Sequence, residues 1–176
     1  MVKYIFLAIL VVFIINLTFP KFVFAESSYV LPYPSYMPGN FLYQPRLFIS
    51  RISKYIYFGD FGKFDYNLKE ADHYLVEAKT LFEYKQYLLA ADALKKSDEY
   101  FKNIHPALEK AEKNRKDISE RDLILKEASR KHMETLGHLS ENLPEEVEWN
   151  PENSTPTNLN LKKILNDSIN IRNSVL

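Results

Sequence analysis

The amino-acid sequence predicts an all-α protein organised around an antiparallel pair of helices. Apolar residues recur in alternating steps of three and four from Phe61 to Phe82, and a second run with this spacing extends from Tyr87 to Ala111. Because few polar residues separate the runs, the two helices should pack as antiparallel neighbours. Four glycines and nine prolines in 176 residues leave long stretches of helix-forming residues. We therefore expect a helical hairpin extended to a three- or four-helix bundle, preceded by an N-terminal signal or anchor helix.

Composition excludes several classes of function. The 23 basic residues balance the 23 acidic ones, and the body of the chain has no basic cluster that could neutralise a run of phosphates, so we expect no nucleic-acid partner. The absence of cysteine excludes disulfides, thiolate metal sites and cysteine nucleophiles. The sequence has neither a glycine-rich phosphate loop nor a serine nucleophile motif. We therefore expect no cofactor and a protein that is not an enzyme.

Residues 1–25 have the three parts of a secretory signal peptide. Lys3 precedes an apolar run that reaches Phe19, and Val23 and Ala25 occupy the cleavage-type positions. We expect cleavage after Ala25. The alternative is a retained transmembrane helix, although the apolar run is shorter than the roughly 20 residues of a typical span. Both interpretations predict an exported, extracytoplasmic body, either free or tethered to the cytoplasmic membrane.

Residues 26–44 are rich in proline and tyrosine and predict an extended spacer. Prolines at positions 32, 34 and 38 disfavour helix and favour a polyproline-like path. We interpret the segment as a stiff tether between the N-terminal segment and the helical body. The alternative is a ligand for an aromatic-lined groove, because tyrosines lie at positions 29, 33 and 36.

A helical domain is expected over residues 45–143, and its first helix has a distinctive charge pattern. No acidic residue occurs between Ser27 and Gly59, whereas three basic residues do, namely Arg46, Arg51 and Lys54. On a helical projection four apolar residues share one side; they are Phe48, Ile52, Tyr55 and Ile56. We expect this side to pack on the hairpin as a third helix. The alternative is a helix that lies in the headgroup plane of a membrane surface, attracted by anionic lipid.

The remainder of the chain predicts further helices and a loop. Pro106 should kink the second hairpin helix or restart it at Asn103, because proline lacks the backbone donor that a helix interior uses. Asp117 begins a capping motif for a helix that ends near Leu143. Residues 144–160 are rich in proline, asparagine and acids and predict a loop, and residues 161–174 predict a short helix.

Histidines supply the candidates for a metal or acid–base site. Glu70 and His73 have the Glu-x-x-His spacing of di-iron bundles, but no second copy of the motif occurs, and a solvated polar face is the alternative. His132 lies on the apolar stripe of its helix, where we interpret it as a core residue; a ligand or catalytic base is the alternative. His105 and His138 are isolated in the sequence. We assign no metal ligand, catalytic residue or cofactor-binding residue.

Three motifs follow one another along the chain. They are Pro38-Gly39-Asn40-Phe41-Leu42-Tyr43, Ala71-Asp72-His73-Tyr74-Leu75-Val76-Glu77-Ala78, and Lys131-His132-Met133-Glu134-Thr135-Leu136 followed by Leu143-Pro144-Glu145-Glu146. In this order, over about residues 31–146, they resemble a family of exported bacterial proteins that carry a helical domain of unknown function. The resemblance implies export and a helical fold, and it supplies no catalytic residue.

The sequence departs from the pattern of that family at two positions. Phe41 stands where the family often has proline, and Lys85 stands where a glycine commonly closes the first hairpin helix. A lysine adopts a left-handed cap conformation only at an energetic cost, so the geometry of the hairpin turn depends on this position.

These observations favour a non-enzymatic exported helical module that acts through contacts with another protein or with a membrane surface. Two alternatives stay open. One is a membrane-anchored regulatory or sensor module whose N-terminal segment remains in the membrane. The other is a metal-binding helical bundle, which would need further acids to converge on Glu70 and His73.

Overall fold

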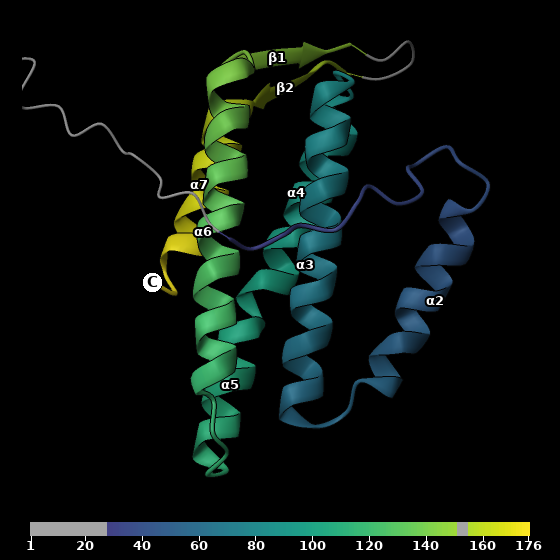
Figure 1. Ribbon diagram of the computed structural model, residues 1–176. Coiled ribbons are helices and arrows are strands. Elements are labelled where there is room, and N and C mark those ends of the chain that lie inside the picture. The colour runs from purple at the N-terminus through teal and green to yellow at the C-terminus, as the bar shows by residue number, and fades with distance from the viewer. Residues whose placement is uncertain (1–27, 151–154) are drawn as a thin grey trace, which may run out of the picture.

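The computed structural model describes residues 28–150 and 155–176, and helices make up most of this part of the chain (Figure 1). The signal or anchor expected over residues 1–25 lies outside the described residues. Within them, no helix is both long enough and apolar enough to cross a lipid bilayer. The fold is mostly helical, as predicted, and a small two-stranded sheet is the exception.

Helices α3 (Gly59–Glu83) and α4 (Tyr87–Lys102) form the predicted hairpin. The turn between them is closed by Lys85, which adopts the left-handed conformation with a φ of 59°. Its backbone N–H donates to the carbonyl of Phe82 at 2.9 Å, and that of Gln86 donates to the carbonyl of Leu81 at 2.8 Å. These two bonds are the Schellman pattern, so a lysine occupies the position that glycine usually takes, at a cost of about 1–2 kcal/mol.

The predicted break in the second hairpin helix is confirmed. Helix α4 ends at Lys102, and α5 (Ile104–Lys113) begins after Asn103. Pro106 lies in the first turn of α5, where its missing N–H removes no helical hydrogen bond. Ile104 and Leu108 are buried in the core, and α5 packs mainly on α3.

Helices α6 (Ser119–Asn142) and α7 (Leu161–Asn173) complete the bundle. Helix α6 begins at Ser119, close to the predicted start, and the Asp117 carboxylate accepts the backbone N–H of Ser119 at 3.0 Å. The predicted capping motif is absent, because Ile118 occupies the N-cap position and no side chain caps the helix. The Asn160 side chain caps α7 by accepting the backbone N–H of Lys163 at 2.8 Å. Helix α7 packs on both α6 and α4, so the C-terminal helix is an integral part of the bundle.

The expectation that residues 144–160 form a loop is wrong in part. Strands β1 (Glu146–Trp149) and β2 (Thr157–Asn160) pair as an antiparallel ribbon in which Val147 lies opposite Leu159. These two side chains are partly buried against the core, whereas the other residues of both strands are exposed. An alternation this short, next to proline and asparagine, cannot be distinguished from a loop by sequence pattern.

Helix α2 (Tyr43–Ile56) lies beside α3 at the edge of the bundle and begins slightly before the predicted position of Pro45 (Figure 1). Two glycines allow the chain to fold back between the helices. Gly59 has a φ of 76°. A Cβ atom at Gly62 would lie 2.8 Å from the carbonyl carbon of Tyr57, which is closer than side chains tolerate. A side chain at Gly62 would therefore displace the turn, and one at Gly59 would cost about 1–2 kcal/mol, so both glycines favour the return of α2 against α3.

The core consists of two apolar clusters with a polar layer between them. The first cluster includes Leu75, Phe82, Leu94, Leu136 and Leu165. The second includes Phe64, Phe101, Ile104, Leu108 and Leu125. Between the clusters, helices α3, α4, α6 and α7 each contribute polar side chains, which we call the polar layer: Asp72, Ser97, Asp98, Ser129, His132, Ser168 and Arg172.

Residues 28–37, which we call the strap, run across α6 and α3 without forming a helix or strand (Figure 1). Leu31 and Met37 pack against the first apolar cluster, and Tyr29 packs against the second. The segment is extended, as expected, and in addition it packs against the bundle through these three side chains. The local sequence does not show which residues of the bundle its apolar side chains contact.

Leu75 and Leu94 test whether the two hairpin stripes share one core. Both are fully buried, with 0% of their surface exposed. Replacing either with alanine should lower the free energy of unfolding by about 2–5 kcal/mol, because a cavity remains where the side chain was. Urea denaturation measures the change, with Lys95→Ala on the exposed side of α4 as the control. Losses no larger than that of the control would show that the stripes do not face each other.

Candidate functional site

An ion pair inside the bundle joins the C-terminal helix to the hairpin. The guanidinium of Arg172 on α7 bonds the carboxylate of Asp98 on α4, and the Ser168 hydroxyl donates to the same carboxylate at 2.7 Å. Arg172 also donates to the Ser97 hydroxyl at 2.8 Å. Its guanidinium carbon lies 5.0 Å from the centre of the Phe101 ring, within the range of a cation–π contact. Because Arg172 has 0% of its surface exposed, these contacts replace water entirely.

His132 continues this layer from α6 to α3 and to the strap. Its Nε2 lies 2.7 Å from a carboxylate oxygen of Asp72, and its Nδ1 accepts from Arg172 at 3.5 Å. Nδ1 can accept only when it carries no proton, so this geometry assigns the proton of a neutral imidazole to Nε2. The other oxygen of Asp72 accepts the Tyr29 hydroxyl at 2.7 Å. The layer thus runs from the strap through α3 and α6 to α7.

Burial sets the ionisation of the layer. It lowers the pKa of His132 below its ordinary value, and the hydrogen bond to Asp72 only partly opposes that effect. Burial also lowers the pKa of Arg172, while the charge of Asp98 acts in the opposite direction. Burial and the charge of Asp72 raise the pKa of Tyr29, so its hydroxyl stays protonated and able to donate. A neutral His132 among these charges matches the interpretation of this residue as a core histidine.

The Glu-x-x-His motif does not gather a metal site in the described part of the chain. Glu70 is buried and His73 is partly buried on the same face of α3. Partial burial lowers the pKa of His73, so its neutral form is favoured. In residues 28–150 and 155–176 no group of three or more histidine, aspartate or glutamate side chains is arranged to hold a metal ion.

Helix α2 is attached to α3 by polar contacts around one carboxylate. Arg46 pairs with Glu77 at 2.8 Å, and the Tyr43 hydroxyl donates to the other oxygen of that carboxylate at 2.8 Å. The guanidinium also lies 5.5 Å from the centre of the Tyr74 ring. Burial raises the pKa of Glu77, whereas the Tyr43 hydrogen bond and the Arg46 charge lower it. Arg46 is therefore committed to the bundle and does not face outward.

The apolar side of α2 points away from the bundle, so the expectation that it packs on the hairpin is wrong. No residue of α2 is buried. Ile52, near the middle of the apolar side, is 45% exposed, and Phe48 is 63% exposed. We call this surface the outer face of α2, and it comprises Phe48, Ile49, Ile52, Tyr55 and Ile56. Phe58, which is 85% exposed, extends it into the turn before α3.

The reason for this orientation lies on α3. The side of α3 that meets α2 presents Glu77, Tyr74 and Tyr66, and the Tyr66 hydroxyl donates to the carbonyl of Ser50 at 3.3 Å. Because this side of α3 presents polar groups that need hydrogen-bond partners, it packs against the polar side of α2, which carries Arg46. The apolar side of α2 is left in solvent. The basic residues Arg51 and Lys54 are also exposed and make no ion pair with a described residue.

A family model described as Domain of unknown function (DUF5667) matches residues 35–146, more than half of the chain. The chain belongs to this family. No curated protein and no solved structure matches it. The match covers helices α2 to α6, and α7 with Arg172 lies beyond it. The polar layer of this DUF5667 protein therefore joins the matched domain to residues on both sides of it.

Sequence reasoning missed most of these residues. It identified His132 but gave it no partner, and it did not identify Arg172, Asp98 or Glu77. One signal was present, since Leu161, Leu165, Ser168 and Arg172 share one face of the C-terminal helix. A charged residue on an otherwise apolar stripe indicates a buried partner, but the sequence does not say which of many carboxylates it is.

His132 should make the stability of the DUF5667 protein depend on pH. Its pKa in the folded protein is below the ordinary value of 6.5. The stability that a neutral His132 contributes is therefore present above about pH 6.5 and is lost as the pH falls below it. Between pH 7 and pH 5 the wild type should lose stability more steeply than His132→Gln, by at most about 1.4 kcal/mol per pH unit.

Thermal unfolding followed by circular dichroism at several pH values measures this difference. Lys95→Gln, on the exposed side of α4, is the control and should retain the wild-type slope. A His132→Gln profile parallel to that of the wild type would contradict the assignment of a buried, neutral histidine.

Proposed function

We propose that this protein is a non-enzymatic exported helical module that docks on an anionic membrane surface through the outer face of α2. The observation that supports the proposal is the orientation of α2, with its apolar side in solvent and its polar side on the bundle. A soluble amphipathic helix normally buries its apolar side. An exposed apolar side next to basic residues is typical of helices that lie in a membrane interface.

Charge favours a lipid surface over a protein partner. Between Ser28 and Gly59 the chain has no acidic residue, and Arg51 and Lys54 are exposed beside the outer face. Each base near an anionic surface contributes about 1 kcal/mol. Partial burial of each apolar side chain of the outer face adds about 1 kcal/mol. The sum, about 7 kcal/mol, supports reversible attachment and not permanent insertion.

The N-terminal residues supply the second element of the proposal. If residues 1–25 act as a signal peptide, the body is released outside the cytoplasm and reaches the membrane only through α2. If they remain as an anchor, they hold the outer face near the bilayer and raise its effective concentration there. Both cases place the body on the extracytoplasmic side.

One observation favours a second candidate, a membrane-anchored regulatory or sensor module. The strap connects the N-terminal segment to the polar layer, because the Tyr29 hydroxyl donates to Asp72, which in turn bonds His132. Displacement of the strap would leave a buried carboxylate without one of its partners, which costs about 1–3 kcal/mol. A state of the membrane segment could reach the bundle along this connection.

Vesicle binding tests the docking face. The form that begins at Glu26 should bind vesicles containing phosphatidylglycerol and should bind neutral phosphatidylcholine vesicles less. Binding should weaken as salt rises to 0.1 M and above, because the attraction is then screened beyond about 10 Å. Flotation with the vesicles measures the bound fraction.

Two variants separate the contributions. Ile52→Asp should abolish vesicle binding and leave the unfolding midpoint nearly unchanged, because Ile52 is 45% exposed and does not belong to the residues that pack against either apolar cluster. Arg51→Gln with Lys54→Gln should weaken binding and reduce its salt dependence, whereas Lys95→Gln with Lys163→Gln, which removes two exposed charges elsewhere, should not. Absence of binding at low salt would contradict the proposal and leave the outer face to a protein partner. A large loss of stability in Ile52→Asp would contradict it differently, by showing that this face packs on the bundle.

N-terminal sequencing decides between release and anchoring. We expect the exported form recovered from cells to begin at Glu26, because Ala25 ends a cleavage-type sequence. A form that begins at Met1 and sediments with membranes would instead support the anchored module.

A further inference from the structure

A groove of about 900 Å³ lies between α3 and α6, beside the strap. Val76 and Phe82 of α3 and Leu139 of α6 line its apolar floor, and Leu31 of the strap lines it as well. Pockets that bind small molecules have volumes of about 300–1,000 Å³ and mainly apolar walls. The groove is separate from the outer face of α2, none of whose residues line it.

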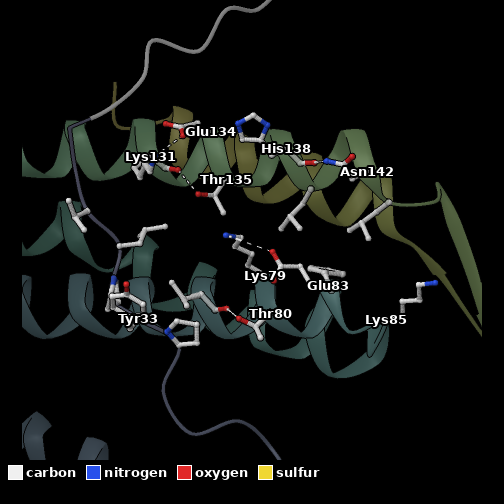
Figure 2. A pocket seen from close by; sticks show the side chains of 18 of the residues that line it. Tyr33, Lys79, Thr80, Glu83, Lys85, Lys131, Glu134, Thr135, His138 and Asn142 are labelled. Carbon is white, nitrogen blue, oxygen red and sulfur yellow. Dashed lines mark hydrogen bonds and ion pairs between the residues drawn. The ribbon is translucent and has the colours of Figure 1, made fainter.

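The rim of the groove carries one excess positive charge. Lys79 and Thr80 on α3 face Lys131 and Thr135 on α6 across it (Figure 2). The lining also includes Lys85 and two glutamates, so three lysines stand against two acids; the acids are Glu83 and Glu134. The pair between Lys79 and Glu83 is long, at 3.8 Å, and exposed, so it holds the lysine weakly. Lys131 is paired more closely, with Glu134 at 2.6 Å, so Lys79 is the more available of the two facing lysines. A ligand with a single negative charge would balance the lining.

The walls of the groove favour an acyl chain over a peptide. Two sides are helices, whose interior backbone groups are bonded within the helix. The strap forms another side, and there Pro32 and Pro34 have no backbone N–H to donate. The Thr80 hydroxyl donates to the carbonyl of Val76 and the Thr135 hydroxyl to that of Lys131, each at 2.9 Å. A peptide in the groove would find few partners for its own amides, and an unsatisfied amide is costly to bury. A hydrocarbon chain has no such groups.

We propose that the groove binds a single-chain amphiphile with one anionic head group, with its hydrocarbon chain on the apolar floor and its head group near Lys79 and Lys131. A fatty acid and a lysophospholipid share this chemistry. The proposal does not rest on membrane docking by α2, because the two surfaces have no residue in common.

Photo-crosslinking to the full chain tests the site. The probe is dodecanoic acid with a diazirine near the end of its chain, and peptide mass spectrometry locates the label. We expect labelled residues in two segments, 76–83 and 135–143. Unlabelled dodecanoate should compete, and each methylene added from octanoate to dodecanoate should improve competition about fourfold, since burial of a methylene contributes about 0.8 kcal/mol. Competition by dodecanoyl lysophosphatidylglycerol, compared with that by dodecanoate, identifies which source binds more tightly.

Variants on the two walls separate a site from non-specific adsorption. Thr80→Trp and Thr135→Trp fill the groove from opposite helices, and each should remove the label from both segments. Thr157→Trp, on the exposed strand β2, is the matched control and should retain the label.

The lysine variants test the head group. Lys79→Gln with Lys131→Gln should weaken competition by dodecanoate up to about tenfold. Lys95→Gln with Lys163→Gln should leave it unchanged.

Three results would overturn the proposal. The first is labelling of the two segments that persists in both tryptophan variants while circular dichroism shows them folded. The second is competition by dodecyltrimethylammonium as strong as that by dodecanoate, which would exclude an anionic head group. The third is absence of label from both segments in the wild type. Ile52→Asp should keep the groove label, so failure of membrane docking and failure of this site are distinguishable.

Discussion

The ion pair between Arg172 and Asp98 is the contact on which the arrangement of the bundle depends. A buried charge without a partner costs several kcal/mol, so α7 can pack only where its guanidinium meets that carboxylate. Two further hydrogen bonds of Arg172 reach Ser97 on α4 and His132 on α6. Apolar clusters tolerate small shifts between helices, whereas these bonds allow one register. The polar layer therefore aligns the two apolar clusters on either side of it.

The same reasoning explains why α2 differs from the other helices. Its attachment to α3 is a second buried charge, Glu77, which Arg46 and Tyr43 satisfy. Because the contact is polar, the apolar side of α2 has no role inside the domain and stays exposed. The glycine turn at Gly59 and Gly62 keeps the helix folded back in this orientation. The structure thus bears an apolar surface that folding does not require, which is a common sign of a binding surface.

The outer face of α2 and the groove between α3 and α6 offer two different kinds of apolar surface. The first is an exposed helix side with basic residues beside it, and it is the surface proposed to dock on a membrane. The second is concave and has lysines on both walls, and it suits one molecule with a hydrocarbon chain (Figure 2). The strap lies between the N-terminal segment and α2 in the sequence, and it also borders the groove. It also contacts the polar layer, through the hydrogen bond from Tyr29 to Asp72.

The sequence alone determined the features that depend on local pattern. The stripes that bury Leu75 and Leu94, the restart after Asn103 and the start of α6 near Asp117 follow from helical periodicity and from backbone hydrogen bonding within a few residues. Only the tertiary structure decided which side of α2 faces inward and which carboxylates bind Arg46 and Arg172. It also decided the pairing of β1 with β2. These outcomes depend on residues far away in the chain. A buried arginine needs a carboxylate, but the local sequence does not say which of the many carboxylates folding will bring next to it.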